Sequence, residues 1–144
     1  MPDREKVAFA VYLIAVEDDR VLMLRRANTG WQDGSYSLIA GHVDADESAS
    51  HAMLREAWEE AGIIVELADL KLVHTMHRKD LTNYLDLYFA VDKWEGKPVV
   101  REPDKADDLS WFSFDNLPSN TVESVRQALK SFRKGIAYSE HGWD

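Results

Sequence analysis

The stretch from 41 to 63, GHVDADESASHAMLREAWEEAGI, constrains this chain more than any other. Its middle, from about Ser48 to Ala61, has no Pro or internal Gly and is rich in Ala, Glu, Leu and Met, which favours a helix that Gly62 ends. At about 100° of turn per residue, one face is apolar and the other acidic. The apolar face collects Met53, Leu54, Ala57, Trp58 and Ala61, and the acidic face collects Glu56, Glu59 and Glu60. We therefore expect the helix to pack on a core through the first face.

The three acids of this helix suit a metal ion better than a solvated surface, which is the usual explanation for such a cluster. Carboxylates in the last turns of a helix meet the negative end of its dipole, at a cost of about 0.3 to 1 kcal/mol each when exposed. Glu56 and Glu60 are also like charges four residues apart. A divalent cation removes both penalties, and Mg²⁺ binds one or two protein carboxylates together with water and substrate phosphates.

The spacing of these acids is part of a longer signature. Five residues separate Gly41 from Glu47, and seven more separate Glu47 from the string REAWEEAGI at positions 55–63. This pattern resembles a complete Nudix box, the signature of hydrolases that cleave a nucleoside diphosphate linked to another group. Many family members have Pro-Gly directly before the first glycine of the box, whereas Ile39 and Ala40 stand there in this chain. That departure affects the shape of the loop rather than metal ligation.

The resemblance implies a fold, a metal and a set of catalytic residues. The fold is α/β, a Nudix-type α/β/α sandwich with a mixed β-sheet, in one domain over residues 1–144. The metal is Mg²⁺, with Mn²⁺ as a substitute, held by Glu56, Glu59 and Glu60. One of these acids or a later one positions the attacking water, and Arg55 orients the glutamates.

A second acidic segment, REPDKADD at 101–108, contains the candidate for that later acid. Its EPDK string before a Trp-Phe strand is similar to that of Nudix members that cleanse nucleotide pools. Glu102 is the first choice for the additional catalytic carboxylate and Asp107 the second. A solvated acidic loop is an equally good explanation of this segment.

Four residues outside the box are candidates for substrate binding. Arg25 and Arg26 end an apolar run and point to opposite faces if the strand continues, so at most one faces a site. Arg26 is our choice for holding a phosphate, and a solvated strand end is an equally good explanation. Trp31 lies in a segment of turn-forming residues, where it either stacks on a base or anchors its own loop. Tyr84 and Trp94 are further candidates for base contact.

The rest of the chain supplies strands and one more helix. A hairpin is expected from 6–17 and 21–24, with further strands at 37–40, 63–67, 71–77, 85–91 and 109–114. Residues 77–80 are expected to form a polar turn. The spacing of apolar residues predicts an amphipathic helix over 121–134 that covers the sheet. The tail, 135–144, has no periodicity and is open between a loose end, packing on a neighbour and reaching a site.

Composition excludes several classes of function. The chain of 144 residues has the length of one ordinary domain and contains no Cys, which excludes disulfides and thiolate catalysis and fits a cytoplasmic location. A net charge of −9 without a Lys/Arg cluster argues against stable nucleic-acid binding. The apolar run at 7–16 is too short to span a bilayer, so no membrane association is expected. The expected partner is a small-molecule nucleotide, and the oligomeric state is open, a homodimer included.

These observations favour a Mg²⁺-dependent hydrolase of a nucleoside diphosphate derivative, foremost of a nucleoside triphosphate, which it converts to monophosphate and pyrophosphate. The alternative is a non-catalytic nucleotide-binding or regulatory module with the same fold. Activity on capped RNA is disfavoured by the lack of a basic patch. If the helix is placed as expected, Trp58→Ala damages folding and Glu59→Gln damages catalysis.

Overall fold

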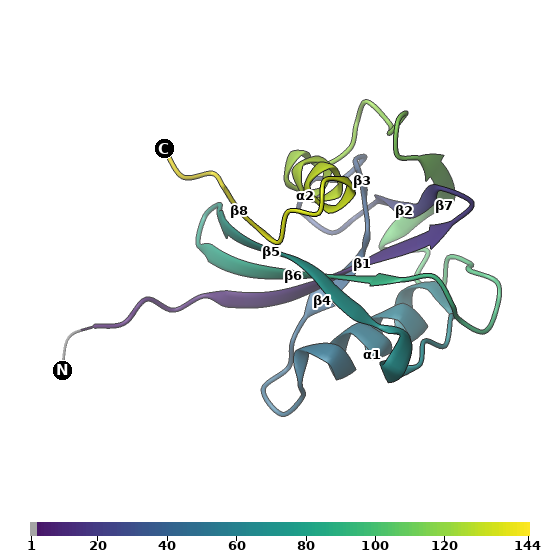
Figure 1. The fold of residues 1–144 in the computed structure, drawn as a ribbon, viewed down its shortest axis with the longest axis horizontal. Helices are drawn as coiled ribbons and strands as arrows, with labels where there is room; N and C mark the ends of the chain where they lie inside the picture. The colour runs from purple at the N-terminus through teal and green to yellow at the C-terminus, as the bar shows by residue number, and fades with distance from the viewer. Residues whose placement is uncertain (1–2) are drawn as a thin grey trace.

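A mixed sheet lies between two helices in the computed structural model, which describes residues 3–144 (Figure 1). The strands are β1 (Ala8–Glu17), β2 (Arg20–Arg26), β3 (Tyr36–Ser37), β4 (Ile39–His42), β5 (Lys71–Lys79), β6 (Asn83–Val91), β7 (Ala106–Ser113) and β8 (Tyr138–His141). The helices are α1 (Ala49–Ala61) and α2 (Glu123–Arg133), and a short 3-10 helix, η1, spans Leu67–Asp69. The helices cover opposite faces of the sheet, as the α/β/α prediction requires.

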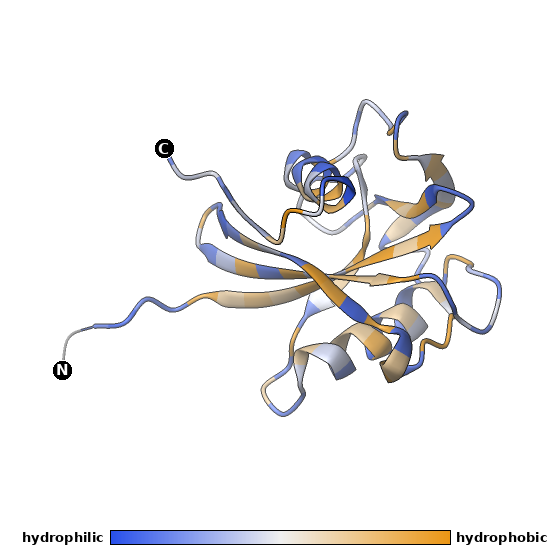
Figure 2. Cartoon of the chain, in the orientation of Figure 1, coloured by the Kyte–Doolittle hydropathy of each residue, from blue (hydrophilic) through white to orange (hydrophobic). Residues whose placement is uncertain are grey.

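Strand β1 is the centre of the sheet. It runs parallel to β6 and antiparallel to β4, and its last residues pair with β2 in the predicted hairpin. The strand order is β3-β2-β1-β6-β5-β8, with β7 on β2 and β4 on β1. In Figure 2, β1 is coloured hydrophobic along most of its length, and its residues 10–15 are all buried. Burial on both faces explains why this segment is a continuous apolar run rather than an alternating one.

Each helix closes a separate hydrophobic core. The core under α1 contains Met53, Ala57 and Ala61 together with residues of β1, β2 and β4. The core under α2 contains Val125 and Leu129 together with the opposite side chains of β1 and β2. The alternation of side chains along β1 and β2 feeds both cores, so these strands tie the two layers together.

Helix α1 begins and ends where the sequence predicts. The Ser48 hydroxyl accepts a hydrogen bond from the backbone N–H of His51 as an N-cap. Gly62 ends the helix with φ of 69°, a left-handed conformation that glycine adopts without strain. The prediction that Trp58 packs in the core is wrong, because its side chain is 48% exposed. The small residues Ala57 and Ala61 form the contact with the sheet, and the indole lies on the helix flank, 4.4 Å from the Arg101 guanidinium carbon.

Three other segments differ from the prediction. Residues 63–67 are not a strand, since only a single bridge, Ile64 to Glu95, precedes the 3-10 helix. Arg78 and Lys79 do not form a turn but continue β5, which pairs with β6 as far as Asn83. The aperiodic tail forms β8, parallel to β5, and its Trp143 indole N–H donates to the His77 carbonyl. Within residues 3–144, neither helix has the length and apolar character needed to cross a membrane.

Candidate active site

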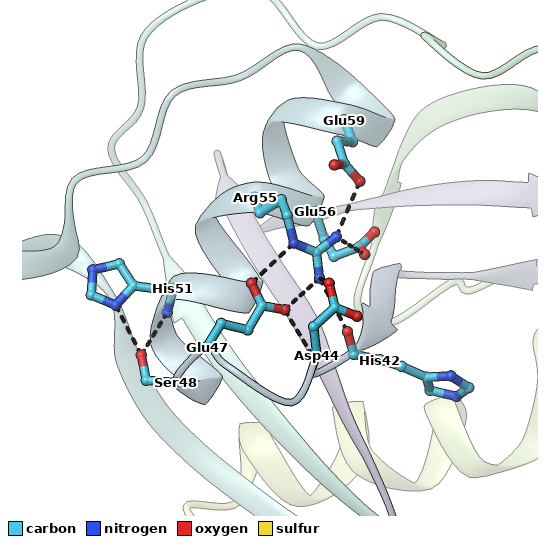
Figure 3. A network of polar contacts seen from close by, with 8 residues as sticks. All are labelled: His42, Asp44, Glu47, Ser48, His51, Arg55, Glu56 and Glu59. Carbon is cyan, nitrogen blue, oxygen red and sulfur yellow. Dashed lines mark hydrogen bonds and ion pairs between the residues drawn. The ribbon is translucent and has the colours of Figure 1, made fainter.

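Arg55 is the centre of a carboxylate network that joins the loop before α1 to the helix (Figure 3). Its Nε and Nη2 donate to the two Glu47 carboxylate oxygens at 3.1 and 2.6 Å. Its Nη1 donates to Glu56 at 2.7 Å and to Glu59 at 3.1 Å. Helical spacing places Glu59 one turn beyond Arg55, whereas Glu47 comes from the loop before the helix. The guanidinium therefore fixes the positions of three glutamates.

The same guanidinium sets the charge of Glu47. Its hydrogen bonds, with help from the Asp44 backbone N–H, lower the pKa of Glu47 to about 2. Glu47 is thus a permanent anion that holds Arg55 in place. The pattern agrees with the orienting role that the Nudix resemblance gives Arg55.

Glu56 and Glu60 lie beneath strand β4. The Ala40 backbone N–H donates to Glu60 Oε1 at 2.9 Å. A Cβ atom on Gly41 would overlap the Glu56 carboxyl group, and Gly41 is the glycine of this chain whose φ is not positive. Glycine is therefore required at position 41 for space rather than for backbone conformation.

The pKa values of both carboxyl groups in this pair are raised. Burial raises the pKa of Glu60 well above its usual value, and the hydrogen bond from the Ala40 N–H partly lowers it again. The negative charges of Glu56 and Glu102 raise this pKa further. Burial also raises the pKa of Glu56, although Arg55 opposes that rise. Partly buried carboxylates that lie this close together are stabilised by a cation.

A hard divalent cation fits this donor set, because every side-chain donor is a carboxylate oxygen. Glu56 and Glu60 are side by side, but Glu59 is 46% exposed and directed to Arg55. Within residues 3–144, no three acidic or imidazole side chains converge closely enough to form a complete metal-ligand group. Mg²⁺ needs only one or two protein carboxylates when phosphate and water complete its shell. The predicted ligands Glu56 and Glu60 fit such a site as they stand, and Glu59 joins it only by leaving Arg55.

A cavity of about 310 Å³ lies on the other side of β4. Its walls are Ala10, Tyr12, Arg26, Trp31, Ala40, Gly41, His42, Arg78 and Tyr84. Ala40 and Gly41 thus touch the carboxylates and the cavity at once. The predicted substrate-binding residues Arg26, Trp31 and Tyr84 all line this cavity, whereas Trp94 packs against Trp111 in the core on the α1 side.

The loop that carries Trp31 is held by Arg26. Arg26 Nε donates to the Trp31 carbonyl at 2.7 Å, and Nη2 donates to the Thr29 hydroxyl at 2.9 Å. The Trp31 indole N–H donates to Asp80 at 2.9 Å. Arg25, the residue before Arg26 on β2, does not line the cavity but pairs with Asp107 at 2.6 Å, and its guanidinium carbon lies 5.7 Å from the Tyr36 ring centre. As predicted, one of the two arginines lines the cavity, but the pairing of β2 with β7 shifts register between Arg25 and Arg26, so regular strand alternation does not explain which one.

Comparison with known proteins agrees with this geometry. The family model described as NUDIX domain matches residues 4–132. The chain belongs to the Nudix family. The resemblance of the stretch from 41 to 63 is thereby confirmed.

Two curated relatives and one solved structure illustrate the family's range. The NAD-capped RNA hydrolase NudC of Pseudomonas aeruginosa is 32% identical over 109 residues, which cover 76% of this chain and 37% of NudC. The ADP-ribose pyrophosphatase of Methanocaldococcus jannaschii is 29% identical over 112 residues, which cover 77% of this chain and 64% of that enzyme. The chain therefore spans less than two thirds of either relative. The crystal structure of a MutT NUDIX hydrolase from Burkholderia pseudomallei superposes with a TM-score of 0.81 at 29% identity, over 88% of this chain and 98% of that one.

Sequence reasoning missed a buried ion pair in the cavity of this Nudix chain. Arg78 donates through Nε to Asp86 Oδ2 at 2.6 Å and through Nη2 to Oδ1 at 3.3 Å. Asp86 is fully buried, and Arg78 is 5% exposed. The signal was Asp86 itself, a lone carboxylate inside the apolar run at 84–91, because a buried acid needs a cationic partner. His42 also lines the cavity, and in Figure 3 its imidazole points away from the Arg55 network.

The two candidate acids of the second acidic segment, Glu102 and Asp107, have different surroundings in the structure. Glu102 is close enough to Glu60 for its charge to raise the pKa of that carboxyl, and its own ion pair with Lys105 is loose, at 3.7 Å. Asp107 is held by Arg25. Of the two acids that the sequence offered, the structure brings Glu102 toward the carboxylate pair.

Proposed function

We propose that this protein is a divalent-cation-dependent Nudix hydrolase, a single domain that cleaves a phosphoanhydride bond of a nucleoside diphosphate derivative. The first substrate to consider is a nucleoside triphosphate, converted to monophosphate and pyrophosphate. The observation that carries the proposal is the partly buried pair of Glu56 and Glu60 on one side of β4 with a cationic and aromatic cavity on the other. A nucleotide bound across β4 has its phosphates beside the carboxylates and its remainder in the cavity.

The residues divide the work of hydrolysis among them. Glu56, Glu59 and Glu60 would hold Mg²⁺ or Mn²⁺, which when bound neutralises charge on the phosphoryl oxygens. Arg55 fixes the rotamer of Glu56 through its hydrogen bond, and Glu59 would leave its hydrogen bond to Arg55 to join the metal. Glu102 accepts a proton from the attacking water while the oxygen of that water bonds to phosphorus. The bridging P–O bond breaks, and its electron pair leaves with the departing phosphate.

The relatives support the class of bond. NudC is named for NAD-capped RNA and the archaeal relative for ADP-ribose, and both of these molecules contain a diphosphate linkage. The shared part of the chains includes the box, so we carry over the bond type and not the identity of either substrate.

Release of phosphate or pyrophosphate tests the proposal, measured on nucleoside triphosphates, nucleotide sugars, ADP-ribose and dinucleoside polyphosphates with and without Mg²⁺. On the best substrate, Glu56→Gln and Glu59→Gln should each lower kcat by about a hundredfold or more, since each removes one carboxylate charge from the proposed metal site. The exposed Glu66→Gln is the matched control and should leave kcat unchanged. Full activity of Glu59→Gln would remove Glu59 from the metal site. Nucleotide binding without hydrolysis of any substrate would favour the non-catalytic module instead.

A further inference from the structure

The cavity beside β4 is lined by a ladder of alternating guanidinium groups and aromatic rings. The Arg26 guanidinium carbon lies 4.9 Å from the Trp31 ring centre, and that of Arg78 lies 5.5 Å from the same ring. Arg78 is also 4.1 Å from the Tyr84 ring, whose other neighbour is the His42 imidazole at 6.2 Å. These contacts hold the planar groups in fixed positions before any ligand arrives.

Both guanidinium groups of this ladder keep one nitrogen available. Arg26 uses Nε and Nη2 for its own loop, and Arg78 uses Nε and Nη2 for Asp86. Within residues 3–144, Nη1 of either arginine donates no hydrogen bond, although Arg78 Nη1 lies 3.7 Å from Asp80. Both arginines line the cavity.

The cavity therefore offers donors in excess of acceptors. An arginine side chain has five N–H donors and no acceptor. The wall residues of the described chain include no carboxylate, because Asp86 lies fully buried behind Arg78. A ligand group that itself presents donors would leave the Nη1 groups unpaired. The cavity is thus complementary to a group rich in hydrogen-bond acceptors.

A nucleobase suits the cavity better than a phosphate. The remaining walls are the rings of Tyr12, Trp31 and Tyr84 and the methyl groups of Ala10 and Ala40, which favour a flat, partly apolar group. The volume of about 310 Å³ exceeds what a single phosphate fills. The phosphates of the proposed substrate are already assigned to the carboxylate side of β4.

We propose that Arg26 and Arg78 make this cavity selective for nucleobases with a carbonyl oxygen at position 6 of a purine or position 4 of a pyrimidine, such as guanine, hypoxanthine and uracil, over adenine and cytosine, which have an amino group at that position. The inference rests on the proposed function, because it assigns the base of the same substrate. It adds the base class and the two residues that determine it.

Matched ligand pairs test this selectivity without metal and without turnover. Inosine and adenosine monophosphates differ in the 6-position group and the N1 proton that goes with it, and uridine and cytidine monophosphates differ in the same way at position 4 and N3. Titration calorimetry on the full chain should show tighter binding of the carbonyl member of each pair by about tenfold. Equal affinities within the pairs, or no binding of any monophosphate at millimolar concentration, would overturn the inference. So would ribose 5-phosphate binding as tightly as inosine monophosphate, because the base would then contribute nothing.

Two arginine variants with a neighbouring control assign the effect. Arg26→Met should bring the inosine-to-adenosine affinity ratio close to one, whereas a mere loosening of the loop would weaken both ligands equally. Arg25→Met, at the neighbouring residue that does not line the cavity, should leave the ratio unchanged. Arg78→Lys keeps a positive charge next to Asp86 and should reduce the ratio if Arg26→Met does not fold. A ratio that survives in both Arg26→Met and Arg78→Lys would sink the assignment.

These results separate the two proposals. Selective binding by a chain that hydrolyses nothing would leave the base selectivity standing and remove the hydrolase. Hydrolysis of inosine and adenosine triphosphates together with equal binding of their monophosphates would leave the hydrolase standing and remove the base selectivity.

Discussion

Gly41 is the residue on which the carboxylate site depends most directly. Its missing side chain makes room for the Glu56 carboxyl group, and its φ does not demand glycine. Gly41→Ala should therefore fold but displace Glu56, lowering kcat by up to about a hundredfold, as misplacement of about 1 Å can do. Mn²⁺ affinity, measured by electron paramagnetic resonance, should fall with it.

Gly135→Ala is the contrasting control for Gly41→Ala. Gly135 has φ of 70° and open space around it, so alanine there strains the backbone and touches nothing. It should reduce the free energy of unfolding by about 1 kcal/mol and leave Mn²⁺ affinity unchanged. Undiminished Mn²⁺ affinity and kcat in Gly41→Ala would show that Glu56 is not held where the site requires it.

At the same scale, the sequence identifies the box residues but not the whole cavity. Glu56, Glu60 and Arg55 follow from their spacing on one helix, which is a local property. Arg78 does not, because its role depends on Asp86 in the neighbouring strand, a contact that no local pattern encodes. The raised pKa of Asp86 has burial as its main cause, and Arg78 opposes the rise.

Helix α1 shows how an element can be predicted correctly while its orientation is partly wrong. The predicted apolar face is correct for Met53, Ala57 and Ala61, which are buried. Trp58 belongs to the same face by periodicity but lies on the flank, under Arg101. Hydrophobicity alone cannot tell a large side chain that packs inward from one that covers an edge.

The exposure of Trp58 reverses the expectation for Trp58→Ala. The indole is 48% exposed, so its removal should cost less than about 1 kcal/mol of unfolding free energy. Met53 on the same helix is fully buried, and Met53→Ala should cost about 2 to 5 kcal/mol. Urea denaturation monitored by circular dichroism measures both values. A larger loss in Trp58→Ala than in Met53→Ala would contradict this orientation of α1.

Strand β8 is an element that the sequence pattern does not predict. Its four residues, YSEH, have no strong strand pattern, and they become a strand because β5 presents a free edge to them. The His74 ring, hydrogen bonded to the Ile136 carbonyl and the Ser139 hydroxyl, ties this tail to the sheet. Such an element depends on tertiary contacts formed by the rest of the fold.

The whole molecule consists of two cores separated by one sheet, and only the sheet is common to them. The carboxylates lie on the α1 side of the sheet and the cavity lies on the other side. Ala40 and Gly41 of β4 stand between them, because they contact the carboxylates and also line the cavity. The layered α/β/α arrangement could be predicted from the order of elements together with the family resemblance. The pairing of β1 with β4 and β6, which brings the two sides together, joins segments far apart in the sequence.

Separate cores should respond independently to substitution. Met53→Ala lies in the core on the α1 side and Leu129→Ala in the core on the α2 side, and each should lower the free energy of unfolding by about 2 to 5 kcal/mol. The double variant should lose the sum of the two within about 0.5 kcal/mol, since the sites share no contacting side chains. Val125→Ala combined with Leu129→Ala is the matched pair within one core, one turn apart on α2, and should depart from additivity by more than that. Urea denaturation of all five variants gives these values, and coupling across the sheet as large as that within α2 would show that the two cores act as one.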